Sequence, residues 1–429
     1  MSAKKYSKPR GTQDFLPEYL DKWNYVERVW RETCRCYGYR QITTPMFEHT
    51  ELFLRTAGDT SDIVTKEMYT FNDKGGRSIT LKPEGTASVV RAYFENNLYV
   101  GDQPVKFFYI MPMFRYERPQ AGRFRQHYQY GVECIGKRSP YIDVEVMSLF
   151  MTFYRKLQII EPLIWLNSLG CPKCRVVYRE KLIDFLNTNR NNLCELCQIR
   201  LDKNPLRVLD CKNEDCHKYI HNAPTIVENL CEDCSRDYEI VKSLLKQENI
   251  PFMEKPTLVR GLDYYNGTVF EVAAKGVSEK EVIAGGGRYD ALLKEIGGID
   301  SSAFGAGAGM ERLIKTMEDH HLSFLFDKKE IFSIVSLDKQ TDDYTFNLCN
   351  KARENGYIFE YYDSSERLGN VLKKSGAKGV SYAILLGLKE FHNNSFIVKN
   401  LDKVKQKEFS LDEFDNVIKS IVDKTEIIR

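Results

Sequence analysis

Alternating apolar and polar positions mark residues 106–136 as two strands joined by a polar, arginine-rich loop. In the second strand, the side chains at even-numbered positions face one side and those at odd-numbered positions face the other. The even positions carry Phe124, Tyr128, Tyr130, Val132 and Cys134, and the odd positions carry Arg125, His127, Gln129, Gly131 and Glu133. One face can therefore pack on a core, and the space at Gly131 suits a small polar ligand. A solvated amphipathic hairpin is the alternative, since polar-out strands are common in antiparallel sheets.

The same reading of spacing and turn residues predicts further elements around this hairpin. They are helices over 18–37, 48–56, 87–96 and 140–158, a strand over 39–45, a polar turn at 57–60, and a hairpin turn at Asn266-Gly267. A second glycine-rich run, residues 304–313, leads into a helix that begins with Glu311 and Arg312. It lacks the G-x-G-x-x-G spacing of a dinucleotide site. Its glycines instead indicate a close approach of the backbone to a bound nucleotide.

The last hundred residues alternate strands with helices. Strands are predicted at 331–336, 357–362, 382–387 and 394–399, and helices at 342–355, 366–375 and 411–423. This order predicts a compact α/β domain with a largely parallel sheet. Its scattered lysines permit RNA contact, although a solvated surface is their default explanation.

Length and composition narrow the class of protein. A chain of 429 residues is long enough for about three domains. A formal net charge of +2 argues against a protein that coats nucleic acid over its whole surface, but it allows a local basic groove. We find neither a run of 18 apolar residues nor an apolar stretch behind the basic N-terminus, so we expect no signal peptide, no membrane span and a cytoplasmic protein.

Eight of the twelve cysteines crowd into residues 171–234 as four close pairs. The pairs are Cys171 with Cys174, Cys194 with Cys197, Cys211 with Cys216, and Cys231 with Cys234. Thiolates at such spacing can share a tetrahedral ion, so four pairs predict two closed, structural zinc sites in a small insertion. The pairs can be matched in three ways, which the sequence does not rank. Unligated buried thiols are the alternative, and His217 and His221 are more simply surface residues than ligands.

Several polar residues are candidates for binding anions or a small substrate. Arg115, Arg118 and Arg123 surround the hairpin loop at a density that suits phosphate oxygens. Glu84 and Thr86 lie at the start of the helix over 87–96, where they either cap its free N–H groups or face a ligand.

These segments together resemble the histidyl-tRNA synthetase family of class II synthetases. The most specific elements are the Arg-Gly-Leu-Asp-Tyr-Tyr run at 260–265 and the strand from Gln129 to Glu133, and the likeness runs from Lys8 to the final domain. The resemblance implies an α+β catalytic domain over 1–325 on a mainly antiparallel sheet. It also implies a cysteine-rich insertion at 171–250 within that domain, an anticodon-binding α/β domain over 328–429, and a homodimer.

The resemblance further implies a role for each site residue. Arg115 and Arg260 would be catalytic at the α-phosphate, with Arg260 also at the substrate carboxylate in place of a metal ion. ATP would contact Arg312 at the γ-phosphate and adenine face, Glu117 at the base edge and Arg123 at the phosphate tail, with Mg²⁺ bridging phosphates. Histidine would contact Glu84, Thr86, Gln129, Glu133, Tyr264, Tyr265 and Tyr289.

Two further positions follow from the resemblance. His127 stands where the family usually has phenylalanine stacked on adenine, and a histidine ring can also stack. Arg118 and Gln120 would reach the tRNA, whose extra 5′ guanosine is the family's precedent for recognition.

The function implied is ATP-dependent ligation of L-histidine to tRNA(His) through a histidyl-adenylate. One alternative is a non-catalytic regulatory subunit of histidine biosynthesis, but such paralogues typically lack the arginine-bearing run and the final domain. A zinc-ribbon nucleic-acid binder is a third possibility, which leaves the hairpin and both glycine runs without a purpose.

Overall fold

The computed structural model describes residues 6–57, 63–118, 123–211, 213–274, 282–325, 330–403 and 405–423. The chain divides into two compact units, Met1–Leu325 and Phe326–Arg429. None of the described helices is long and apolar enough to cross a membrane.

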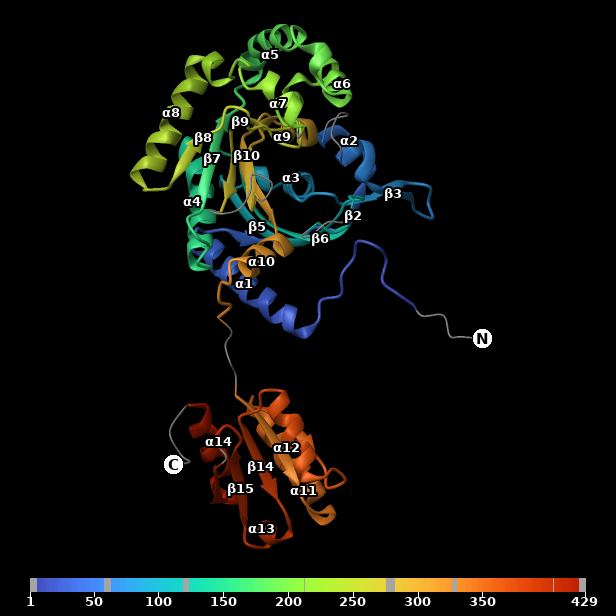
Figure 1. The fold of residues 1–429 in the computed structure, drawn as a ribbon, viewed down its shortest axis with the longest axis vertical. Helices are drawn as coiled ribbons and strands as arrows, with labels where there is room; N and C mark the ends of the chain where they lie inside the picture. Colours follow the sequence, from blue (N-terminus) through green and yellow to red (C-terminus); the bar gives the residue numbers. More distant parts are fainter. Residues whose placement is uncertain are drawn as a thin grey trace. The chain divides into compact units, whose positions relative to one another are not determined.

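An eight-stranded sheet organises the first unit (Figure 1). Its order is β1 (Arg40–Gln41), β5 (Val105–Phe114), β6 (Gln126–Ile135), β11 (Ala303–Gly309), β10 (Ala284–Arg288), β9 (Asn266–Ala273), β7 (Leu163–Ser168) and β8 (Phe252–Glu254). Among the described pairs of this sheet, only β1 with β5 and β7 with β8 run parallel. The sheet is thus mainly antiparallel, as expected, and the predicted hairpin is its β5–β6 pair.

The two faces of this sheet carry different layers. On one face, apolar side chains of β6 such as Tyr130 and Val132 pack against α1 (Pro17–Cys36), α4 (Pro140–Lys156), α8 (Glu232–Gln247) and α10 (Met310–Asp319). On the other, Tyr109 and Met111 of β5 pack with α3 (Thr86–Glu95) and α9 (Asp290–Gly297). The alternation along the second strand therefore separates a core face from a polar face, as predicted.

Most predicted helices of this unit are present, but three local predictions were wrong. The strand predicted over 39–45 is only Arg40–Gln41. The helix predicted over 48–56 begins later, as α2 (Thr50–Ala57), because residues 47–49 form a strand instead. That strand, β2 (Phe47–His49), belongs to a small sheet with β3 (Tyr69–Asn72) and β4 (Ser78–Leu81). Asn266-Gly267 is not a hairpin turn. Gly267 does adopt a positive φ of 57°, but the pair opens β9 after an irregular approach rather than joining two strands. A short π-helix spans Ile63–Glu67, and residues 58–60 of the predicted polar turn lie outside the described residues.

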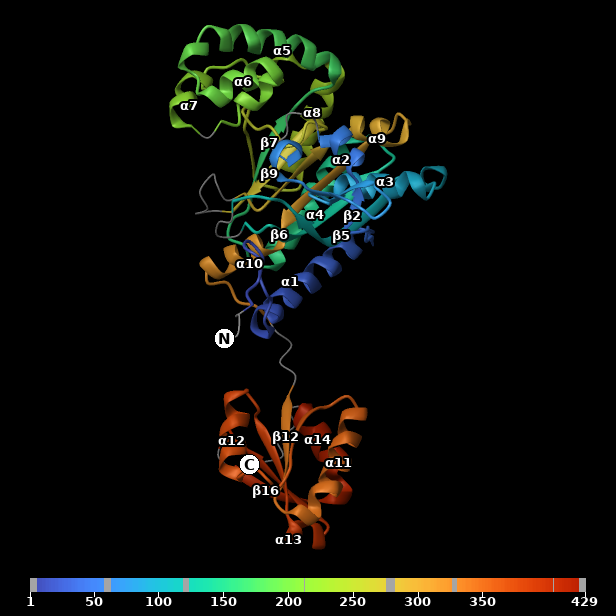
Figure 2. The same ribbon diagram turned by 90° about the vertical axis from the view of Figure 1, so that its right-hand side faces the viewer.

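The cysteine-rich stretch is mostly helical. It comprises α5 (Pro172–Asn187), α6 (Glu195–Lys203), α7 (Glu214–Ile220) and the start of α8, with 3₁₀ turns at Arg190–Asn192, Pro205–Val208 and Val227–Asn229. These helices gather beyond one end of the large sheet (Figures 1 and 2). They enclose an apolar cluster of their own, which includes Leu182, Leu201 and Val208.

The second unit holds a five-stranded sheet. Its order is β13 (Ile358–Tyr362), β12 (Ile331–Ser336), β14 (Tyr382–Leu386), β15 (Ser395–Asn400) and β16 (Lys405–Ser410), with helices α11 (Asp342–Glu354), α12 (Leu368–Ala377), α13 (Leu388–His392) and α14 (Phe414–Val422). Helix α12 covers one face, and α11 and α14 cover the other (Figure 2).

The expectation of a largely parallel sheet in this unit holds for β13, β12 and β14 but was wrong for the other side of the sheet, where β14 with β15 and β15 with β16 pair antiparallel. The strand β16 escaped prediction because four of its six residues are charged or amide-bearing, and it lies at the exposed sheet edge.

Candidate active site

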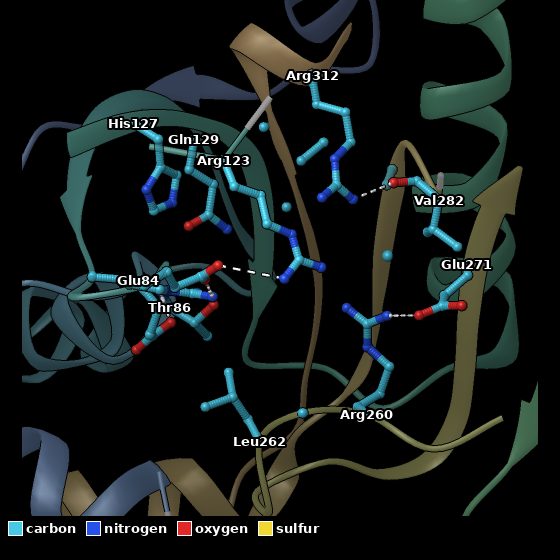
Figure 3. Close-up of a pocket in the computed structure, with 18 of the residues that line it drawn as sticks. Glu84, Thr86, Arg123, His127, Gln129, Arg260, Leu262, Glu271, Val282 and Arg312 are labelled. Carbon is cyan, nitrogen blue, oxygen red and sulfur yellow. Dashed lines mark hydrogen bonds and ion pairs between the residues drawn. The ribbon is translucent and has the colours of Figure 1, made fainter. Parts of the chain in front are cut away.

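A cavity of about 430 Å³ lies on the polar face of the large sheet, opposite the layer of α1 and α4. Side chains from the β5–β6 hairpin, the 260–265 segment and the start of α10 line it. Figure 3 shows Arg260 and Arg312 on one side of the cavity, His127 and Glu84 on the other, and Arg123 reaching between them. The predicted residues that line this cavity are Glu84, Thr86, Arg115, Glu117, Arg123, His127, Gln129, Arg260, Tyr264, Tyr265 and Arg312.

Glu133 is fully buried beside this cavity and accepts hydrogen bonds from three hydroxyl groups. Thr86 Oγ1 donates at 2.8 Å and the Tyr109 hydroxyl at 3.3 Å to Oε1, while the Tyr289 hydroxyl donates to Oε2. Burial raises the pKa of the Glu133 carboxyl group to about 8, although the donated hydrogen bonds act the other way. The side chain is therefore a buried acid held in one orientation.

The space at Gly131 is filled by the protein itself, which corrects the expectation that a ligand would occupy it. Tyr109 pairs with Gly131 across the hairpin, and a Cβ at Gly131 would lie 2.5 Å from the Tyr109 hydroxyl oxygen. That hydroxyl group also lies 3.4 Å from Gln129 Nε2. Tyr109 was missed because only the strand pairing shows which side chain enters the space.

The glycines of β11 leave room for side chains of β6. A Cβ at Gly305 would lie 1.8 Å from Glu133 Oε2, and one at Gly307 would lie 1.9 Å from Gln129 Nε2. The expected close approach of a nucleotide to the backbone therefore does not account for these two positions. Gly307 and Gly309 both line the cavity, but at Gly309 a Cβ would have only the Arg312 side chain near it.

Glu84 caps the helix α3 and faces the cavity as well. Its carboxylate accepts the backbone N–H groups of Thr86 at 2.7 Å and Ala87 at 2.9 Å, as a capping side chain does. The Tyr264 hydroxyl group lies 3.5 Å from Glu84 Oε2. Thr86 is not a cap, because its hydroxyl group donates to Glu133 instead.

Three of the predicted arginines are held at the cavity wall. Arg115 Nε donates to the Pro83 carbonyl oxygen at 2.7 Å, and Arg312 Nη1 donates to the Val282 carbonyl oxygen at 2.9 Å. Glu117 lies between Arg115 and Arg123, with shortest N–O distances of 3.9 and 3.5 Å. These three cations therefore face one cavity, and two of them share the carboxylate of Glu117.

His127 carries an uncharged imidazole. Burial, followed by the positive charge of Arg115, lowers the pKa of its ring to about 3, and Arg312 contributes in the same direction. Phe124, which the alternation placed on the core face, also lines the cavity because it precedes β6.

Arg260 is fixed by the strand next to it. Its Nη1 donates to Glu271 Oε1 at 2.6 Å, and a Cβ at Gly285 would lie 2.3 Å from the same nitrogen. The rings of Tyr264 and Tyr265 are buried with centroids 4.7 Å apart, and the ring of Tyr289 lies 5.9 Å from that of Tyr264. These tyrosines therefore form one aromatic group.

Four predicted residues are not among those that line the cavity. Glu133 and Tyr289 are buried behind its wall, where they are hydrogen-bonded to each other. Arg118 is exposed and does not line the cavity, and Gln120 lies outside the described residues.

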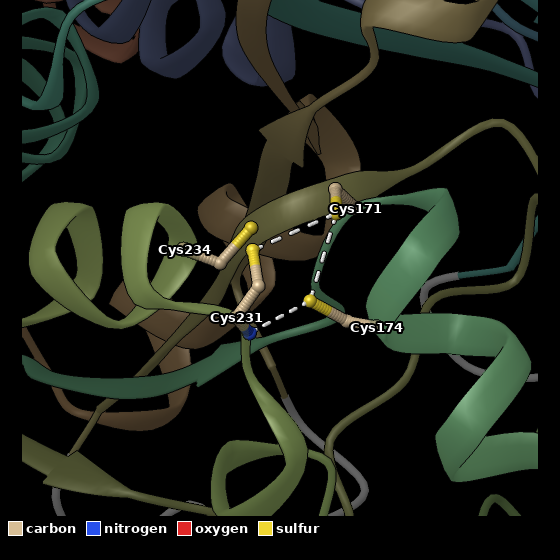
Figure 4. A group of neighbouring side chains, drawn as sticks. All are labelled: Cys171, Cys174, Cys231 and Cys234. Atoms are coloured by element: carbon tan, nitrogen blue, oxygen red, sulfur yellow. Dashed lines mark hydrogen bonds between the residues drawn. The ribbon is translucent and has the colours of Figure 1, made fainter.

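The eight paired cysteines form two groups, one matching of the three that were open. Cys171, Cys174, Cys231 and Cys234 make the first group, in which the sulfurs converge (Figure 4), and Cys194, Cys197, Cys211 and Cys216 make the second. The sulfurs of each group lie within 4.8 Å of one another, with Sγ–Sγ distances such as 3.6 and 3.9 Å. Four sulfurs around one ion at roughly 2.3 Å would lie about 3.8 Å apart, so either group could hold a metal ion.

Comparison with known proteins decides the family. The family model described as histidyl-tRNA synthetase matches residues 11–313. The chain belongs to the histidyl-tRNA synthetase family. A second family model, described as an anticodon-binding domain, matches residues 332–421 of the chain.

Relatives of the same family match over nearly the whole length. A curated histidine–tRNA ligase from Caldanaerobacter subterraneus is 43% identical over 412 residues, which is 96% of this chain and 99% of that relative. A solved structure of apo histidyl-tRNA synthetase from S. aureus is 35% identical, covers 96% of this chain and 98% of its own, and has a TM-score of 0.81. The match to a structure from Bacillus halodurans C, titled as an ATP phosphoribosyltransferase regulatory subunit/histidyl-tRNA synthetase, is 21% identical over 90% of this chain and 99% of its own, with a TM-score of 0.63, and shows the fold alone.

Residues that the sequence analysis did not name also belong to this site. Glu271 pairs with Arg260, and Glu311 accepts the backbone N–H of Tyr128 at 2.9 Å while lining the cavity. Arg207 and Asp210 reach the cavity from the cysteine-rich stretch. Glu271, as the one charged residue of the apolar run 269–273, could have been suspected from sequence. Arg207 gave no such signal.

Proposed function

We propose that this chain catalyses the ATP-dependent ligation of L-histidine to tRNA(His) through a histidyl-adenylate. The observation that carries the proposal is one cavity with guanidinium groups at one side and a buried carboxyl group with amide and hydroxyl groups at the other. Amino-acid activation needs both. The substrate carboxylate attacks the α-phosphorus of ATP as pyrophosphate leaves, and the 3′-terminal ribose hydroxyl group of the tRNA then takes the aminoacyl group as AMP leaves.

The histidine half of the cavity is built from buried acceptors and aromatic rings. We assign the ammonium group and ring of histidine to Glu84, Thr86, Gln129 and Glu133, enclosed by the aromatic group of Tyr264, Tyr265 and Tyr289. Gln129 Oε1 is buried and has no hydrogen-bond partner among the described residues, which leaves an acceptor for the substrate. Such a site rejects analogues that lack the matching donor, because its own polar atoms would stay unpaired.

The ATP half is built from cations and a neutral ring. We assign the α-phosphate to Arg115, the phosphate tail to Arg123 and the γ-phosphate side to Arg312, with Mg²⁺ supplying charge neutralisation between phosphates when bound. The pKa of about 3 at His127 supports stacking of its ring on adenine, since an imidazolium beside two arginines would be repelled. Glu117 would accept from the base edge.

We place Arg260 where the two halves meet. The 2.6 Å ion pair with Glu271 holds its guanidinium at the cavity wall, so a hydrogen-bonding edge is presented without reorganisation. In this position it would neutralise the carboxylate of histidine and the α-phosphate as they react. Arg115 and Arg260 are thus the residues proposed to act on the reacting atoms.

The regulatory alternative is not favoured. Arg260 is present and oriented in the cavity, and residues 332–421 match the anticodon-binding model. The structural likeness to a regulatory subunit does not discriminate, because it shows only the fold.

The proposal includes tRNA(His) and a second copy of this chain as partners in the cytoplasm. The second unit would bind the anticodon, and exposed Arg118, with Gln120, would contact the acceptor end. The likeness of the first helix and following strand to the family's dimer-forming motif supports a homodimer.

We assign zinc to both cysteine groups. The short Sγ–Sγ distances fit tetrahedral thiolate ligation, and backbone N–H groups point at the sulfurs, with Cys231 N 3.1 Å from Cys174 Sγ and Cys194 N 3.2 Å from Cys216 Sγ. Four protein ligands leave no open position on an ion, so these sites would stabilise the insertion rather than take part in the reaction.

Histidine-dependent exchange of pyrophosphate into ATP tests the proposal directly. We expect exchange with L-histidine and none with other amino acids, followed by charging of a tRNA(His) transcript. Pure, folded protein that supports no exchange would favour the regulatory alternative instead.

A further inference from the structure

The cysteine-rich insertion contacts the 260–265 segment through three side chains. Arg207 Nη1 donates to the Arg260 carbonyl oxygen at 3.2 Å, and Asn204 Nδ2 donates to Asp263 Oδ1 at 3.0 Å. Arg175 Nη2 donates to the Tyr265 carbonyl oxygen. The segment that carries Arg260 is therefore held at its beginning, middle and end by residues outside it.

Arg207 is the most buried of these contacts. Its side chain is 6% exposed, lines the cavity, and keeps Nε without a hydrogen-bond partner among the described residues. Burying a guanidinium with an unpaired N–H costs free energy, and the surrounding structure must compensate for it. Its own carbonyl oxygen accepts from Arg200 Nη1 at 3.2 Å, which fixes the backbone from which the side chain extends.

The second cysteine group holds the turn that carries these residues. Asn204 follows α6, which contains Cys197, and the turn Pro205–Val208 leads to Cys211 of the same group. Both ends of residues 204–210 are thus tied to one cluster, and the turn between them can move little relative to it. Neither Asn204 nor Arg207 belongs to a predicted substrate-binding position.

We propose that Arg207 and Asn204 are positioning residues that hold the 260–265 segment in its reactive arrangement. Arg207 fixes the backbone at Arg260, while Glu271 fixes its guanidinium, so the two contacts together determine where that group lies. Asn204 fixes the segment ahead of Tyr264 and Tyr265. The inference rests on the proposed activation of histidine and extends it, because it makes the insertion part of the activation site.

Kinetics of R207M and R207K, measured by histidine-dependent pyrophosphate exchange in the full-length protein, test the proposal. R207M keeps side-chain length but removes every donor. We expect kcat/KM for histidine to fall about 10- to 100-fold, because a misplacement of about 1 Å at a reacting group has effects of that size. The KM for ATP should stay within about twofold, since the proposed ATP contacts other than that of Arg260 lie on other segments. R207K, which can still donate to the carbonyl oxygen, should recover part of the loss.

A matched control is R190A, which removes a partly exposed arginine whose ion pair among the described residues is with Asp202 in the same insertion. It should leave both constants unchanged. Zinc content and thermal melting report whether each variant is folded. If R207M does not fold, N204A decides in its place, with an expected loss of about tenfold in kcat/KM for histidine.

The outcomes separate the two proposals. A folded R207M, or N204A in its place, with the wild-type kcat/KM for histidine overturns the positioning role while the proposed function stands. A parallel rise in the KM for ATP and histidine also overturns it, because a general loss of structure would have that effect. A wild-type protein without exchange overturns the proposed function itself.

Discussion

Replacement of Glu133 by glutamine tests the histidine half of the cavity. The variant keeps the size of the side chain and one acceptor oxygen for the hydroxyl groups of Thr86, Tyr109 and Tyr289, so E133Q should fold. It removes the negative charge proposed to face the substrate. Leaving a buried cation without its partner costs about 3–5 kcal/mol, which corresponds to a rise in the KM for histidine of about 100- to 4000-fold. Pyrophosphate exchange at varied histidine concentration measures this rise.

The same substitution has a pH signature in the protein without substrates. Burial raises the pKa of Glu133 from 4.5 to about 8, so the folded state holds a proton that the unfolded state has released. The contribution of protonated Glu133 to the free energy of unfolding is therefore fully present below about pH 4.5 and is lost as the pH rises towards about 8. From about pH 6 to 8, wild type should lose about 2 kcal/mol of unfolding free energy relative to E133Q. Other buried acids, such as Asp143, cancel in this difference.

Urea denaturation of both proteins at several pH values gives this difference, and E95Q, which changes an exposed carboxylate on α3, is the control. In wild type, kcat/KM for histidine should rise between about pH 7 and 8 as Glu133 ionises in the free enzyme, while E133Q should lack this rise. A wild-type KM for histidine in E133Q would remove Glu133 from substrate binding. A stability difference independent of pH would contradict its buried, raised pKa.

Three more perturbations test other parts of the molecule. R260A should keep the fold and lower adenylate formation by about 100-fold or more, and unchanged exchange would remove Arg260 from the mechanism. Removal of Phe326–Arg429 should spare exchange while weakening tRNA charging, and equal loss of both would contradict anticodon binding by that unit. Purified protein should contain one zinc ion for each of the two cysteine groups and lose thermal stability with a chelator. Fewer than one zinc ion per chain, even after reducing, zinc-supplemented refolding, would refute the metal assignment.

Local pattern was enough to predict much of the fold. Helical spacing located α1 and α4 within two residues of their ends, and strict alternation located the β5–β6 hairpin and its two faces. The prediction of a hairpin turn from the Asn266-Gly267 pair failed, because the positive φ of Gly267 also occurs at the start of a strand. The alternation rule failed at β16 because an exposed edge strand needs no apolar alternation.

The site was predictable only where one segment carries it. Gln129 and Glu133 share a strand face, so their common direction followed from sequence. Tyr109, Glu271 and Arg207 did not, because each reaches the site through pairing or packing with a distant part of the chain. Spacing within one segment cannot indicate which neighbouring side chain fills the space above a glycine.

The buried carboxyl groups at and beside the cavity bear on how it would bind its substrates. Burial raises the pKa of Glu84, Glu133, Glu271 and Glu311, yet among these the described structure pairs only Glu271 with an arginine in an ion pair, that with Arg260. Burying an acid away from an ion-pair partner destabilises a folded protein, and a ligand that carries the opposite charge offsets this cost when it binds. A zwitterionic amino acid bound beside a polyphosphate supplies both signs at once. We therefore expect the substrates to pair with these acids and with the guanidinium groups of the cavity, and each should bind more tightly when the other is present.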